Sequence, residues 1–314
     1  MSNPALKQLG FEADERVVIV HADDVGMCHA ANAAFWENQA FGVLTCGSVM
    51  VPCSWVPEMA AWCRAHPEAD VGVHITLTSE WEGHRWGPVS TCDPRSGLID
   101  EEGCLWRSNR EVYRHMDVDA AIAEMRAQVD KALSMGIDVT HIDTHMGTVM
   151  HPLLVRAYIE LALEHRIPAM LPRISEERLA QWGVDPAMGR AMLAELDQLR
   201  ASGFPVLDHI CAADYRAADR GRAADPGGAT AGLDVPGDAI EIYCRLFDSV
   251  PAGITHLLLH PSVPGYDIEA ITTSAPERIA DYRTFLRPEL QVYVTERGIR
   301  LIGYRRLRDL IRAT

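Results

Sequence analysis

The chain has 314 residues, of which 48% are hydrophobic and 23% charged, and its formal net charge is −15. Nucleic acids and anionic membranes attract Lys- and Arg-rich surfaces, so this negative charge argues against both as partners. The sequence has no run of about 18 apolar residues to span a bilayer and no secretory signal near Met1, so we expect a cytoplasmic protein. The eight cysteines form no C-x-x-C pair and are expected to be reduced and packed as small apolar residues.

Apolar, β-branched segments alternate with segments of helical periodicity along the whole chain. The expected strands are 17–20, 43–51, 71–77, 139–143, 167–171, 206–210, 255–259 and 298–302. The expected helices are 29–41, 54–66, 117–135, 152–161, 186–202, 236–249, 276–286 and 304–312, with a surface loop at 211–234. This alternation predicts an α/β fold with a parallel sheet, most simply a single (β/α) barrel of seven or eight mostly parallel strands, as in a TIM barrel.

Residues 79–116 interrupt this alternation. They contain Trp81, Trp86 and Trp106 together with several Gly and Pro residues, and they show little periodicity. Long connections in compact domains tend to be functional or disordered, and three tryptophans make disorder the weaker choice. We therefore interpret 79–116 as a lid-like insertion over the strand ends, within one domain that covers residues 1–314.

Several expected strands run directly into an acidic residue or a histidine. The polar strand ends are Asp23 and Asp24, His74, the segment His141 to His145, and His260. Because the carboxyl ends of parallel barrel strands meet at one face, these side chains are expected to converge. One Asp with two His is also a ligand set for a divalent cation that keeps positions open for water and substrate. The pattern therefore indicates a metal-dependent hydrolase.

The neighbouring carboxylates Asp23 and Asp24 raise a geometric problem. Successive side chains of a strand point to opposite faces, so both reach one site only if the chain turns, which Gly26 permits. One carboxylate could then bind metal while the other polarises the water; the alternative is a solvated Asp-Asp turn. His74 lies inside an otherwise apolar strand, where a lone histidine is more often a core residue than a ligand.

The third polar segment has His141, Asp143 and His145 in alternation, so they could share one face, with Asp143 supporting a ligating histidine. His260 follows an apolar strand and could deliver a proton to a leaving amine. Arg173 could pair with a catalytic carboxylate and keep it ionised, or be an ordinary surface arginine.

Four of these segments, in order, resemble the motifs of the YdjC-like carbohydrate deacetylases, distant relatives of the polysaccharide deacetylases. HADDVG (21–26) is similar to the family's N-A-D-D-F-G, and GVHITLT (72–78) to G-[LV]-H-L-x-L-T. THIDTH (140–145) is similar to T-H-x-D-[ST]-H, and LHP (259–261) to the late H-P-G. The chain has His21, Val25 and Ser262 where the family usually has Asn, Phe and Gly.

The resemblance implies a metal held by Asp24, His74 and His145, with Asp23 as general base and His260 as general acid. It also implies a distorted barrel that removes N-acetyl groups from small sugars such as chitooligosaccharides, acting on a small carbohydrate partner, with a homodimer as one arrangement. For the single divalent cation, two imidazole ligands favour zinc, whereas one carboxylate and open water positions also suit magnesium or manganese.

A further set of residues is expected to bind substrate or to support the ligands: Arg173, Asp143, His21, Trp81 and His151. Trp81 follows the His74 strand closely, and its flat, amphipathic ring could stack on a sugar. The alternative is that it packs the insertion onto the barrel. Two other functions stay open at this point: a metallohydrolase of a different small amide or ester, and a non-catalytic sugar-binding protein on the same fold.

Overall fold

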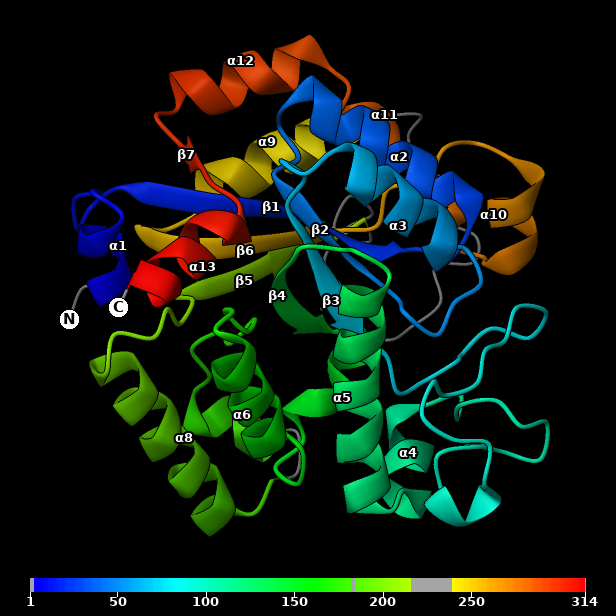
Figure 1. The fold of residues 1–314 in the computed structure, drawn as a ribbon. Coiled ribbons are helices and arrows are strands. Elements are labelled where there is room, and N and C mark those ends of the chain that lie inside the picture. The colour runs from blue at the N-terminus through cyan, green and yellow to red at the C-terminus, as the bar shows by residue number, and fades with distance from the viewer. Residues whose placement is uncertain (1–2, 182–183, 216–238, 314) are drawn as a thin grey trace.

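The computed structural model describes residues 3–181, 184–215 and 239–313, and its centre is a parallel sheet (Figure 1). The strands are β1 (Arg16–Val25), β2 (Cys46–Val49), β3 (Val71–Ile75), β4 (Val139–Thr144), β5 (His209–Ala212), β6 (Gly253–Leu259) and β7 (Arg300–Leu301). Their order is β4-β3-β2-β1-β6-β5, with β7 beside β1, and every pairing is parallel. The predicted parallel α/β fold is therefore confirmed.

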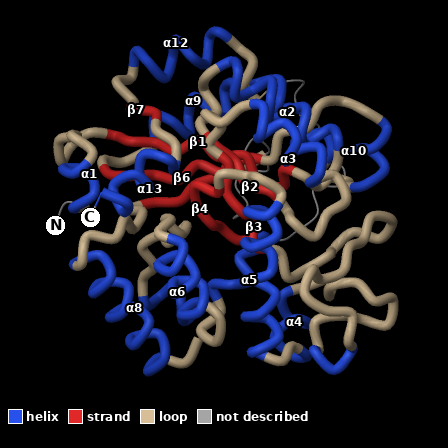
Figure 2. Tube along the Cα trace, in the orientation of Figure 1, coloured by secondary structure: helices blue, strands red, loops and turns tan. Residues whose placement is uncertain are grey.

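Helices surround this sheet, as the tube in Figure 2 shows. They are α1 (Pro4–Gln8), α2 (His29–Phe41), α3 (Val56–Ala65), α4 (Asn109–His115), α5 (Val118–Ser134), α6 (Val155–His165), α7 (Glu176–Gln181), α8 (Pro186–Ala201), α9 (Ile240–Ser249), α10 (Tyr266–Ile271), α11 (Ala275–Thr284), α12 (Pro288–Glu296) and α13 (Tyr304–Ala313). Short 3₁₀ turns cover Pro94–Ser96 and His145–Met150. Among the described helices, none is both long and apolar enough to cross a bilayer.

The named strands do not close into a complete ring. Between the two edge strands lies the segment 167–173, which makes only single pairings, although a short strand is predicted at 167–171. The Met170 amide donates to the Ile142 carbonyl at 2.8 Å, and the Leu207 amide donates to the Leu171 carbonyl at 2.9 Å. Pro168 and Pro172 lack the amide hydrogens that a continuous ladder needs, so this side of the barrel is irregular.

Strand β1 divides into an apolar part and a polar end. Residues Val17 to Val20 of β1 are fully buried, the pattern of a parallel strand covered on both faces. Full burial of one such side chain stabilises the fold by about 1.5–3 kcal/mol. The following residues His21, Asp23 and Asp24 are polar and still buried. The apolar parts thus form the core, and the carboxyl ends of the strands form a buried polar site.

The insertion 79–116 contains one helix that the periodicity did not reveal, α4. Ser108 caps its start and has the spacing of a capping box with Glu111: Ser108 accepts a hydrogen bond from the Glu111 amide and donates its hydroxyl to the Glu111 carboxylate at 2.8 Å. All eight cysteines are free thiols. Most of the expected loop 211–234, and the start of the helix expected at 236–249, lie outside the described residues.

Candidate active site

A distortion at the end of β1 brings two adjacent carboxylates to one site. The pairing of β1 with β2 shifts register between Ala22 and Val25, and Asp24 has φ 60° in the left-handed region. A non-glycine residue held there costs about 1–3 kcal/mol, and such strain clusters at functional sites. As a result, Asp23 Oδ2 lies 4.0 Å and Asp24 Oδ1 3.5 Å from Nε2 of His74.

Asp24, His74 and His145 form a compact cluster in which one ligand atom from each lies within 4.8 Å of the others. Asp24 Oδ1 lies 3.1 Å from His145 Nδ1, and all three side chains are buried. Ligands bound to one cation at about 2.0–2.2 Å are separated by about 3 Å, so these distances suit a shared metal ion.

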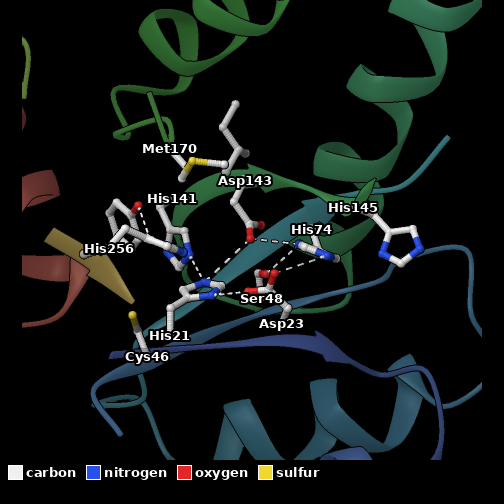
Figure 3. A network of polar contacts seen from close by, with 12 residues as sticks. His21, Asp23, Cys46, Ser48, His74, His141, Asp143, His145, Met170 and His256 are labelled. Carbon is white, nitrogen blue, oxygen red and sulfur yellow. Dashed lines mark hydrogen bonds and ion pairs between the residues drawn. The ribbon is translucent and has the colours of Figure 1, made fainter. Parts of the chain in front are cut away.

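The far nitrogen of each histidine in this cluster faces a second carboxylate. His74 Nδ1 lies 2.8 Å from Asp143 Oδ2, as Figure 3 shows, and His145 Nε2 lies 3.0 Å from Glu80 Oε2. Metal-ligating histidines usually donate their other ring hydrogen to such a partner. Asp143 was among the predicted residues. Glu80 was not, because it lies beyond its strand in the aperiodic insertion.

Arg278 of α11 forms an ion pair with a carboxylate of the site. Its Nη2 donates to Asp24 Oδ2 at 2.7 Å, and both side chains are buried. Burial alone would raise the pKa of Asp24, but Arg278 and the two histidines hold it well below its usual value. The residue predicted for such a pairing, Arg173, lies instead 3.5 Å from Asp208, whose carboxylate accepts the Ile254 amide at the start of β6. That contact is at the opposite end of the strands.

Asp23 and His260 lie together at the edge of the cluster. His260 Nε2 is 3.9 Å from Asp23 Oδ2, and the His260 side chain is 37% exposed. The His260 amide donates to Asp281 at 3.0 Å, which fixes the backbone after β6. Burial raises the pKa of Asp23, but its hydrogen bond to His21 and the neighbouring His74 lower it below the usual value. An ionised carboxylate therefore lies next to a histidine that solvent reaches.

Beneath the site lies a buried group of histidines. His21 Nδ1 is 2.7 Å from Asp23 Oδ1, and its Nε2 is 2.8 Å from Nε2 of His141 (Figure 3). His256 Nδ1 is 2.9 Å from the Tyr304 hydroxyl, and burial lowers the pKa of His256 to about 3. His21 is fully buried, and its two ring nitrogens contact Asp23 and His141.

Two further predicted residues lie on or beside the insertion. Trp81 is half-buried, with the Arg278 guanidinium 5.6 Å and the His145 ring 6.4 Å from its own ring, so it borders the cluster. His151 stacks on Tyr113 at 4.1 Å between ring centroids.

Fold and site together define a parallel α/β barrel with a carboxylate–histidine centre at its strand ends. Residues 17–296 match the model of the YdjC-like protein family, and the chain belongs to that family. A carbohydrate deacetylase of Thermus thermophilus is 32% identical over 292 residues, which are 93% of this chain and 94% of that protein. A chitooligosaccharide deacetylase of Yersinia enterocolitica is 27% identical over 162 residues, 51% of this chain and 60% of that protein.

Among solved structures, a protein of Enterococcus faecalis V583 that was proposed to cleave cellobiose phosphate has the same fold. It matches with a TM-score of 0.71 and 19% sequence identity, covering 92% of this chain and 98% of that one.

Proposed function

We propose that this protein is a carbohydrate deacetylase that hydrolyses the N-acetyl group of a small amino sugar or its oligosaccharide with one divalent cation. The observation that carries the proposal is the convergence of Asp24, His74 and His145, with Asp23 and His260 beside them. The names of the relatives in Thermus and Yersinia support the substrate class. A homodimer and a cytoplasmic location remain predictions.

The donor set fits a cation. Asp24 Oδ1, His74 Nε2 and His145 Nδ1 would hold it, because the other nitrogen of each imidazole already faces a carboxylate. The cation supplies Lewis acidity, which makes water a stronger nucleophile and stabilises negative charge that develops on the acyl oxygen. Zinc suits two imidazoles best, and magnesium or manganese are compatible with the carboxylate.

In this proposal Asp23 and His260, at the edge of the cluster, carry out the proton transfers. Asp23 takes the proton of the attacking water, since His21 and His74 keep its carboxylate ionised. His260 then gives a proton to the departing amine. Its partial exposure and its position 3.9 Å from Asp23 support this role. A protein that only bound sugar would need neither residue.

The proposal is tested with purified protein and chitooligosaccharides, measuring released acetate and new free amines together. We expect equal amounts of both, and their loss in Asp23→Asn. The exposed carboxylate Glu82 provides the control, since Glu82→Gln should retain full activity. Acetate released from an O-acetyl ester, with none from any N-acetylated sugar, would contradict amide hydrolysis and favour an esterase.

A further inference from the structure

The turn that carries His145 needs support from outside itself. In the 3₁₀ turn His145–Met150, both Met146 (φ 55°) and Gly147 (φ 68°) have left-handed backbone conformations. For Met146 this conformation costs about 1–3 kcal/mol. Met146 is 47% exposed, so burial of this residue contributes little to holding its strained conformation.

Helix α4 of the insertion supplies that support. Asn109 Nδ2 donates to the Met146 carbonyl at 2.7 Å, and Asn109 Oδ1 accepts from the Thr148 hydroxyl at 2.6 Å. The Tyr113 hydroxyl donates to the Thr148 carbonyl at 3.0 Å. One helix thus holds the backbone on both sides of Gly147.

Glu80, at the start of the insertion, contacts the imidazole itself. Its two carboxylate oxygens lie 3.1 and 3.0 Å from His145 Nε2. A hydrogen on Nε2 that is donated to Glu80 leaves the lone pair of Nδ1 directed toward Asp24. Glu80 therefore selects both the ring orientation and the tautomer that a cation beside Asp24 requires.

The insertion is itself fixed to the barrel. Glu124 of α5 is fully buried, and its carboxylate accepts the amides of Val89 at 2.8 Å and Ser90 at 2.7 Å. Within the insertion, Arg85 pairs with Asp100 at 2.6 Å. The buried Trp86 donates its indole N–H to the Thr78 carbonyl at 2.9 Å. The contacts with Glu124 and Thr78 do not involve the His145 turn, so the insertion has its own attachment to α5 and to the segment that follows β3.

We propose that residues 79–116 form a fixed arm that positions His145, with Glu80 as a positioning residue for the imidazole and Asn109 for its backbone. The inference rests on the proposed function, which makes His145 a metal ligand. In this proposal the insertion forms part of the metal site. Cation affinity, and not only turnover, is then set from the insertion.

The first test is titration of Co²⁺ into the metal-free protein, with the visible absorption of the bound ion as the measure of binding. Glu80→Ala should weaken Co²⁺ binding by about 10- to 100-fold, the usual effect of losing the carboxylate partner of a ligating histidine. Glu80→Gln keeps an acceptor oxygen, so it should lose less Co²⁺ affinity than Glu80→Ala. Glu82→Gln, at an exposed carboxylate two residues further on, should bind Co²⁺ like the parent.

The second test uses α4, where Asn109→Ala should also weaken Co²⁺ binding and the exposed neighbour variant Arg110→Ala should not. The proposal of a positioning arm would be overturned if Glu80→Ala and Asn109→Ala both bound Co²⁺ within about twofold of the parent affinity. A twofold change is far smaller than the loss expected when such a partner is removed. A lower melting temperature with unchanged affinity would overturn it too, since that assigns a purely structural role. A parent protein that binds no Co²⁺ would overturn the proposed metal site itself.

Discussion

The buried pair of Arg278 and Asp24 gives the sharpest prediction about the site. Replacing Arg278 with Met keeps most of the side-chain volume but leaves the Asp24 carboxylate buried without its cation. The two side chains are 9% and 1% exposed, so solvent cannot take over the role of Arg278. Breaking a buried pair in this way costs about 3–5 kcal/mol. For a chain of 314 residues, with an unfolding entropy of about 2.1 cal/mol/K per residue, that corresponds to roughly 5–8 °C in melting temperature.

Binding of the proposed cation should reduce this loss of stability. A divalent ion bound beside Asp24 would compensate the charge that Arg278→Met leaves unpaired, so saturating Co²⁺ should raise the melting temperature of the variant more than that of the parent. Thermal melts of both proteins, each with and without Co²⁺, measure the difference. Arg173→Met is the matched control, because its pair with Asp208 lies at the other end of the strands. Its effect should not depend on Co²⁺. If Arg278→Met lowered the melting temperature equally with and without Co²⁺, the reasoning would be refuted.

Three other outcomes follow from the same geometry. Asp23→Asn should keep bound metal and lose about 10²-fold or more in turnover, measured as acetate release, because it removes the proposed base; loss of the metal would instead make Asp23 a ligand. Trp81→Ala should raise KM for an N-acetylated sugar with little change in metal content, and Trp106→Ala should do less; unchanged KM with a lower melting temperature would make Trp81 structural.

The third outcome concerns pH and His256, whose pKa falls from 6.5 to about 3 on burial. The unfolded chain then binds the extra proton, so stability should decline as pH falls below about 6.5, by up to ~1.4 kcal/mol per pH unit. Urea unfolding at several pH values should show a smaller decline in His256→Gln, and equal slopes would contradict this.

The strand-end residues were predictable because parallel strands bring their carboxyl ends to one edge. The positions of Asp24, His74 and His145 follow from that rule and from the family motifs, and the structure brings them together. Two partners could not be found this way. Arg278 lies 254 residues from Asp24 in sequence, on a helix whose pattern shows only packing, and Glu80 lies in a segment without periodicity. Tertiary packing alone decides their contacts.

Some helices and strands have other boundaries than the sequence predicts. These differences occur where prolines or capping residues outweigh the pattern of apolar residues. The segment 167–171 has the composition of a strand, but the prolines at 168 and 172 prevent a regular ladder. The strand expected at 206–210 begins later, as β5. Helix α4 was missed although Ser108 and Glu111 have the spacing of a capping box, because its apolar periodicity is weak.

The most direct test of the account is acetate release from an N-acetylated chitooligosaccharide by chelator-treated protein as a divalent cation is added back. We predict no release before addition, and a rise to a plateau at one cation per chain. The same titration of His145→Ala should give no activity at that ratio. Undiminished release from the fully chelated protein, or full activity of His145→Ala with one cation or none, would contradict the proposed centre.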